Sequence, residues 1–200
     1  MAQFFDEGFD PDDLSIRVSD MLIATADASD ELIDKAVSQT LLLLRQRLKM
    51  DVVFVSEFVD GKRVFRYADT PPDRPVIAVG DSDPLEQTWC QRVVDGRMPE
   101  VVVNAAQFRQ TTRLPDAPFD IGTHLSTPIL LDDGQIYGTL CCFSFSPHAS
   151  VQTRDLKNLK SVAQLVARKI DTAQARLGAP EGAKDQSASA PVTFTLQPKT

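Results

Sequence analysis

The side chains that could bind a metal or carry thiol chemistry in this sequence are Cys90, Cys141, Cys142, His124 and His148. Structural zinc sites are built from Cys or His pairs only a few residues apart. The sequence has no Cys-x-x-Cys pair, and neither histidine has a second ligand three or four positions away. We therefore expect no metal site, and the odd number of cysteines predicts reduced thiols. Haem ligation by either histidine stays chemically open, although nothing around them favours it.

The adjacent pair Cys141-Cys142 is the thiol arrangement that would suggest a redox switch. Neighbouring residues of a strand point to opposite faces, so a direct disulfide between them would be strained. Free cysteine is also among the residue types most often buried. We therefore predict two packed thiols, because a redox role would need an accessible thiolate with a lowered pKa.

Motifs for other catalytic chemistry are absent from the sequence. It contains no Gly-x-Ser-x-Gly, no His-Glu-x-x-His and no glycine-rich phosphate loop, and most of its nine glycines stand at predicted turns. The acidic pair Asp132-Asp133 precedes Gly134, which favours a turn over a metal site. The sequence therefore predicts a protein that is not an enzyme and needs no cofactor. An enzyme stays the third alternative, and turnover of a metabolite would reveal it.

Composition and charge predict one domain in the cytoplasm. The chain has 200 residues, of which 42% are hydrophobic and 24% charged. The longest aliphatic run, Leu41–Leu44, is too short to span a membrane, and no secretory signal opens the sequence. The net charge of −7 argues against a nucleic-acid partner. Residues 1–34 hold ten acids and one base, so the acidity belongs to a solvated leader.

Three of the predicted helices lie in the leader and at the two ends of the main body. The acidic leader covers 1–28 and holds a short helix from Pro11, and Ser29 caps the next helix. The buried stripe of that helix is Ile33, Val37, Leu41, Leu44 and Leu48. The last helix starts at Thr153 and carries a heptad seam of Leu156, Leu159, Ala163, Val166, Ile170, Ala173 and Leu177. Residues 178–200 are poor in large apolar groups and predict a disordered tail or linker.

Two antiparallel hairpins are predicted between these helices. Residues 52–59 and 63–67 are rich in β-branched and aromatic side chains, and Asp60-Gly61 between them is a strong hairpin signal. A second hairpin joins residues 124–131 to residues 135–145. Hairpins framed by helices predict an α+β fold with an antiparallel sheet.

The segment between the hairpins is expected to be mixed. Val76–Val79 is predicted as a short strand, and Asp83 is predicted to cap a helix running to Val94. Residues 100–104 are predicted as another short strand. Residues 105–120 are expected to be irregular or weakly helical, because prolines interrupt them.

Three passages occur in an order and at spacings typical of one family. They are the strand and turn of residues 51–61, the block PLEQTWCQRVV with its following VVVNA, and the run LSTPI…DG…IYGTLCC of residues 125–142. Together they resemble GAF domains, a superfamily of sensory and signalling ligand-binding domains. The resemblance implies a PAS-related six-stranded antiparallel sheet with helices on both faces, over residues 29–177.

The resemblance also implies a small-molecule pocket on one face of the sheet. Strand alternation, placed on that fold, directs a set of side chains toward the pocket, and His124 begins the late hairpin where relatives often hold an aromatic residue. The candidate ligand-binding residues are Phe54, Ser56, Phe58, Trp89, His124, Tyr137, Thr139 and Cys141. The alternative is that these side chains only fill a core.

Three specialised kinds of relative fit the sequence poorly. Covalent bilin binders carry a cysteine near the start of the late hairpin, and residues 111–122 contain none. Cyclic-nucleotide binders carry an Asn-Lys-Phe-Asp-Glu signature that is missing here. The three cysteines also do not align with the set that free-methionine-sulfoxide reductases use. The resemblance therefore predicts a ligand without naming it.

The function expected from this sequence is a non-catalytic sensory or regulatory GAF domain that signals through its terminal helices. The resemblance and the heptad seam imply a homodimer through those helices, and a kinase or a cyclic-dinucleotide enzyme as output domain. The chain would be a stand-alone protein or the sensor segment of a longer one. The alternative is a ligand-free dimerisation or docking module of a bacterial-type signalling system, with the pocket packed shut.

Overall fold

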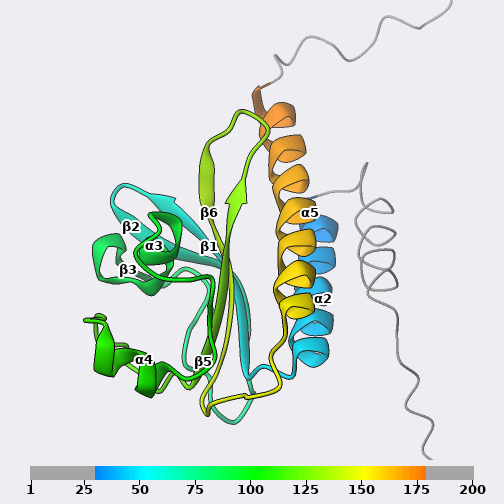
Figure 1. The fold of residues 1–200 in the computed structure, drawn as a ribbon. Coiled ribbons are helices and arrows are strands. Elements are labelled where there is room, and N and C mark those ends of the chain that lie inside the picture. Colours follow the sequence, from blue (N-terminus) through cyan, green and yellow to red (C-terminus); the bar gives the residue numbers. More distant parts are fainter. Residues whose placement is uncertain (1–29, 179–200) are drawn as a thin grey trace, which may run out of the picture.

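Residues 30–178 are described by a computed structural model and form one antiparallel sheet with helices on both faces (Figure 1). The predicted leader over 1–28, and the predicted tail beyond its first residue, lie outside the described residues. The strands are β1 Val52–Val59, β2 Lys62–Asp69, β3 Ser82–Pro84, β4 Val101–Val102, β5 Thr123–Leu130 and β6 Ile136–Ser144. Their order in the sheet is β3-β2-β1-β6-β5-β4. The six-stranded α+β fold expected from the sequence is confirmed.

Two tight hairpins and one long-range pairing build the centre of this sheet. Asp60 and Gly61 join β1 to β2 with φ angles of 51° and 70°, the two positive values that a type I′ turn requires. β5 and β6 are joined by the turn that contains Gly134, whose φ is 83°. β1 then pairs with β6, which sets Phe54 opposite Cys141. Residues from the two predicted hairpins therefore meet on one surface.

The first and last described helices cover one face of the sheet (Figure 1). They are α2, Asp30–Leu48, and α5, Thr153–Gly178, and their apolar side chains pack on those of β1, β5 and β6. The part of the predicted seam from Leu156 to Ile170 packs in or against this core, and Leu159, Ala163 and Val166 are at most 2% exposed. The heptad pattern therefore reflects packing on the chain's own sheet. It does not by itself require a partner helix.

Shorter elements cover the opposite face (Figure 1). They are the 3₁₀ helix η1, Leu85–Gln87, the helix α3, Trp89–Val94, and the helix α4, Ala105–Thr111. The Thr88 side chain caps α3 by accepting a hydrogen bond from the backbone N–H of Gln91, and Asn104 caps α4 in the same way. A connection without regular structure then leads from α4 to β5. These elements enclose space above the sheet.

Two expectations for the middle segment are wrong. Val76–Val79 forms no strand, and the third strand is β3, because backbone hydrogen bonds between Phe65 and residues 80–81 draw the following segment alongside β2. Asp83 caps no helix, because its carboxylate forms an ion pair with Arg63. The α-helix starts later than expected, after Thr88.

Candidate functional site

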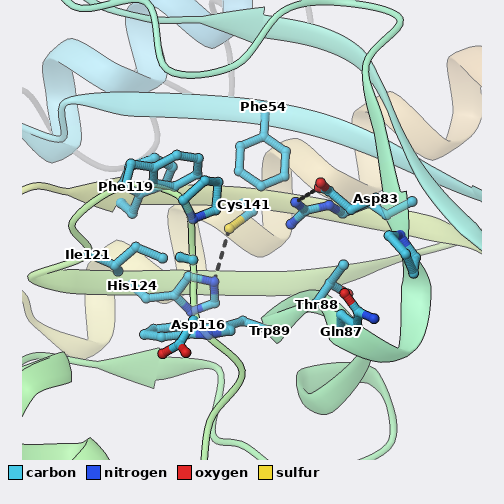
Figure 2. A pocket seen from close by; sticks show the side chains of 15 residues that line it. Phe54, Asp83, Gln87, Thr88, Trp89, Asp116, Phe119, Ile121, His124 and Cys141 are labelled. Carbon is cyan, nitrogen blue, oxygen red and sulfur yellow. Dashed lines mark hydrogen bonds and ion pairs between the residues drawn. The ribbon is translucent and has the colours of Figure 1, made fainter.

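A cavity of about 410 Å³ lies on the sheet face opposite α2 and α5 (Figure 2). The sheet contributes the lining residues Phe54, Arg63, Asp83, Pro84, His124, Cys141 and Phe143. The segments above it contribute Gln87, Thr88, Trp89, Asp116, Ala117, Pro118, Phe119 and Ile121. This volume lies within the range of ~300–1,000 Å³ that is typical of small-molecule sites.

Aromatic rings form much of the cavity wall. Phe119 stacks on Phe143 with ring centroids 5.0 Å apart and planes at 5°. Phe54 meets Phe65 edge to face, also at 5.0 Å. Such pairs stabilise the wall beyond the area they bury. The ring faces also offer an apolar surface to a flat organic molecule.

Trp89 joins α3 to the connection above the cavity. Its indole Nε1 donates a hydrogen bond of 3.1 Å to the carbonyl oxygen of Pro115, and its ring lies edge-on to His124 with centroids 5.3 Å apart. The guanidinium of Arg109 lies over the same ring at 5.3 Å. Trp89 is only 4% exposed. It therefore fixes the position of the segment that closes the cavity.

Arg63 brings a cation to the edge of the cavity. Its guanidinium forms an ion pair with Asp83 and lies 4.5 Å from the centroid of the Phe65 ring. The Nη1 group donates to the sulfur of Cys90 at 3.5 Å, while Nε is buried without a hydrogen-bond partner. A buried donor without a partner is destabilising.

Two of the three thiols lie together at the cavity floor. The sulfur of Cys141 is 3.1 Å from Nε2 of His124, and the Cys90 thiol hydrogen-bonds to Cys141. That hydrogen bond, the charge of Arg63 and the contact with His124 hold the pKa of Cys90 well below its ordinary value, despite burial. Burial and the neighbouring Cys90 raise the pKa of Cys141 well above it. Cys142 packs in the core under α2 and α5, where burial raises its pKa.

Four of the eight predicted site residues line the cavity: Phe54, Trp89, His124 and Cys141. Ser56 and Thr139 lie on the same sheet face but are fully buried, and their hydroxyl oxygens are 3.0 Å apart in a mutual hydrogen bond. Phe58 also packs on this face, at the edge of the aromatic cluster. These three residues support the floor and do not touch the enclosed space.

The expectation that Tyr137 faces the cavity is wrong. Its ring packs against the core under α2 and α5, on the other side of the sheet. The cause is an irregularity in the β5–β6 ladder: Ile129 pairs with Gly138 and Leu130 pairs with Ile136, which leaves Tyr137 without a cross-strand partner. Simple alternation from Cys141 back to Tyr137 fails at such a bulge.

Tyr137 makes a pH-dependent contribution to stability. Burial, followed by the nearby Glu57 carboxylate, raises its pKa from 10.0 to about 12. The folded state holds the phenol proton more tightly than the unfolded chain does, so this contribution is present below pH 10.0 and is lost as the pH rises toward about 12. Over that range we expect wild type to lose about 1–2 kcal/mol more unfolding free energy than Tyr137→Phe, a value reduced for the partly exposed side chain. Urea denaturation of both proteins at pH 10.0 and at about pH 12 measures this difference. An equal loss of unfolding free energy in wild type and Tyr137→Phe would contradict it.

Several residues in or directly behind the cavity wall were not predicted from the sequence. Arg63 shares a strand face with Phe65, and that alternation could have identified it. Phe119 and Asp116 stand in a proline-broken connection, whose sequence carries no periodic signal for direction. Cys90 belongs to α3 and meets a strand far along the chain, which no local pattern predicts.

Comparisons with known proteins agree with this architecture. A family model of the GAF domain matches residues 33–170. The structure resembles the GAF domain of a phosphoenolpyruvate-protein phosphotransferase from Coxiella burnetii, with 16% identity, 82% of this chain and 97% of that chain covered, and a TM-score of 0.63. It also resembles a phycocyanobilin-bound GAF domain of a cyanobacterial phytochrome, with 11% identity, 86% and 100% covered, and a TM-score of 0.63.

A third similar structure is an enzyme. It is the free methionine-R-sulfoxide reductase of Neisseria meningitidis in complex with its substrate, with 16% identity, 88% of this chain and 98% of that chain covered, and a TM-score of 0.63. No functionally curated protein matches the sequence. At such low sequence identities, likeness to solved structures shows only that the fold is shared. The match to the family model shows membership of the family, because it covers more than half of the chain. This chain therefore belongs to the GAF domain family.

Proposed function

We propose that this chain is a regulatory domain that binds a small organic molecule in the cavity between the sheet, α3 and residues 116–121. GAF domains are a family of sensory and regulatory ligand-binding domains, and the cavity is the observation that carries the proposal for this member. Its aromatic walls supply apolar contact area. Arg63 and Asp83 add an ion pair of charged groups to its lining.

The central strands provide a route from the cavity to the terminal helices. On β6, Cys141 lines the cavity while Leu140 and Cys142 pack against the core under α2 and α5. On β1, Phe54 lines the cavity while Val55 packs against the core under α2 and α5. A ligand that favours one position of these strands would therefore bias the position of α5, with a coupling no larger than its difference in affinity for the two states.

The cavity and α5 favour this proposal over a ligand-free docking module. That alternative expects a pocket packed shut and an apolar seam left for a partner. The structure instead has a cavity, and the seam from Leu156 to Ile170 packs in or against the domain's own core. We propose signalling from the terminal helices to an output domain such as a kinase or a cyclic-dinucleotide enzyme. A homodimer would then use the outer surface of α2 and α5, where Leu42 is 38% exposed.

We further propose that the domain acts in the cytoplasm without a catalytic step. None of the helices between residues 30 and 178 combines the length and apolar character that a bilayer span requires. Within the same range, no three His, Cys, Asp or Glu side chains converge in the manner of a metal site. Ligand that is recovered unchanged after incubation supports the non-catalytic part of the proposal, and product formation contradicts it.

A thermal-shift screen of small metabolites tests the binding proposal. At a concentration of ~100 times its Kd, a ligand adds about 2.7 kcal/mol of stability, so the melting temperature rises by several degrees. Ala117 lines the cavity, and Ala117→Phe places a benzyl group in it, so this variant should lose the shift. Ala106→Phe, on the exposed surface of α4, is the matched control and should keep it. A ligand that stabilises both variants equally would contradict binding in this cavity.

A further inference from the structure

Four side chains with reactive or charged groups meet at the floor of the cavity, and they come from four different elements. Cys90 lies in α3, Cys141 in β6, His124 in β5 and Arg63 in β2. Nε2 of His124 is 3.1 Å from the Cys141 sulfur, and Nη1 of Arg63 is 3.5 Å from the Cys90 sulfur. Cys90 and Cys141 pack in the same buried cluster between these groups. Figure 2 shows the contact of Cys141 with His124 among the side chains that line the cavity.

The two sulfurs have different surroundings. Cys141 lines the cavity, so a molecule small enough to enter can reach its sulfur, and Nε2 of His124 lies 3.1 Å from that sulfur. Cys90 lies one layer behind and does not line the cavity. Its contact with Arg63 favours the thiolate, which is the form that attacks other sulfur atoms. One thiol is therefore placed to meet an oxidant and the other to react with the oxidised partner.

We propose that Cys90 and Cys141 form a reversible disulfide when a small hydroperoxide enters the cavity. Burial keeps the Cys141 thiol protonated, so the thiol passes its proton to Nε2 of His124 as its sulfur attacks the outer peroxide oxygen. The O–O bond breaks, an alcohol or water leaves with that proton, and Cys141 becomes a sulfenic acid. Cys90 then attacks the Cys141 sulfur and forms the S–S bond, and the hydroxyl leaves as water. Overall, two thiols and one hydroperoxide give one disulfide, one alcohol and one water.

Reduction by a dithiol restores both cysteines, so the disulfide is a reversible modification of the domain and is separate from the bound ligand, which the proposed function expects to be recovered unchanged. The dithiol loses two electrons and two protons to the protein disulfide and becomes a disulfide itself. The oxidised form would tie α3 to β6 directly across the back of the cavity. This inference does not rest on the proposed function, because a peroxide could enter a cavity that binds no other ligand.

Cys142 provides a control within the same chain. It follows Cys141 directly and is also fully buried, but it lies on the opposite face of the sheet in the core under α2 and α5. It should stay reduced in the folded protein. Unfolding removes the separation of Cys142 from the other two cysteines. Peroxide treatment in concentrated urea should therefore oxidise the three cysteines without selectivity.

Peptide mapping after hydrogen peroxide treatment of the reduced, folded full chain tests the proposal. We expect one linked peptide pair, Cys90–Cys141, a mass loss of two hydrogen atoms per chain, alkylation of Cys142 only, and full reversal by dithiothreitol. Cys142→Ser should give the same link, whereas Cys90→Ser and Cys141→Ser should lose it completely. Mapping of the wild-type protein alone decides the matter if a variant fails to fold. Oxidation that links Cys142, links two chains, or leaves all three thiols free would overturn the proposal.

Discussion

Gly138→Ala is expected to lower the unfolding free energy by about 3 kcal/mol or more, since a rigid overlap forces backbone to move. A Cβ atom at position 138 would stand 1.9 Å from the carbonyl oxygen of Ser56 and 2.9 Å from the Cα of Glu57. Both atoms belong to the backbone of β1, so no side chain can rotate away. Strands β1 and β6 would have to separate where they hold the cavity floor.

Gly80→Ala is the matched control for that experiment. Position 80 has a φ of 92°, but a Cβ there meets no atom within 4 Å, so only the backbone strain remains. That strain amounts to about 1–2 kcal/mol. Urea denaturation of both variants measures the difference. Equal losses, or a loss below about 1 kcal/mol for Gly138→Ala, would show that β1 and β6 are not in such close contact.

Trp89→Ala is expected to destabilise the domain by about 3–5 kcal/mol and to release the segment above the cavity. The substitution removes a large buried ring, its edge contact with His124 and its hydrogen bond to Pro115. Trp89→Phe retains much of the buried ring and loses the N–H donor, so it should destabilise by about 1–2 kcal/mol. A ligand found for wild type should bind Trp89→Ala much more weakly.

The unfolding free energy of these variants should be measured by circular dichroism. Trp89 is the sole tryptophan of the chain, so its replacement removes the tryptophan fluorescence signal. If Trp89→Ala lost less than about 1 kcal/mol, the ring would not be holding α3 to the connection. If Trp89→Phe lost as much as Trp89→Ala, the hydrogen bond to Pro115 would dominate over ring packing. Either outcome would change the account of the cavity wall.

The hairpins could be predicted because their signals are local. Asp60-Gly61 combines two residues that tolerate positive φ with alternating strands on both sides, and the structure has that turn. The α5 seam shows the limit of such patterns. Its spacing indicates one apolar face but cannot say what covers it, and Leu159 packs on the chain's own sheet.

The cavity could be predicted only where strand alternation is regular. Phe54 and Cys141 were found because β1 and β6 keep their register between them. Tyr137 was misplaced because a bulge adds one residue at the start of β6. Phe119 and Cys90 were missed because their neighbours are distant in sequence. Because Cys141 and Cys142 are neighbours in the sequence, they were the thiol pair considered for a redox switch. The fold instead places Cys141 in the same buried cluster as Cys90.

Native mass spectrometry tests the central claim, that the cavity holds a small molecule, most directly. The wild-type protein is incubated with fractionated small metabolites from cells and sprayed under non-denaturing conditions. We expect a non-covalent adduct of one small molecule per chain. Ala117→Phe should show no such adduct. The absence of any adduct from every fraction, or an adduct that Ala117→Phe retains in full, would contradict it.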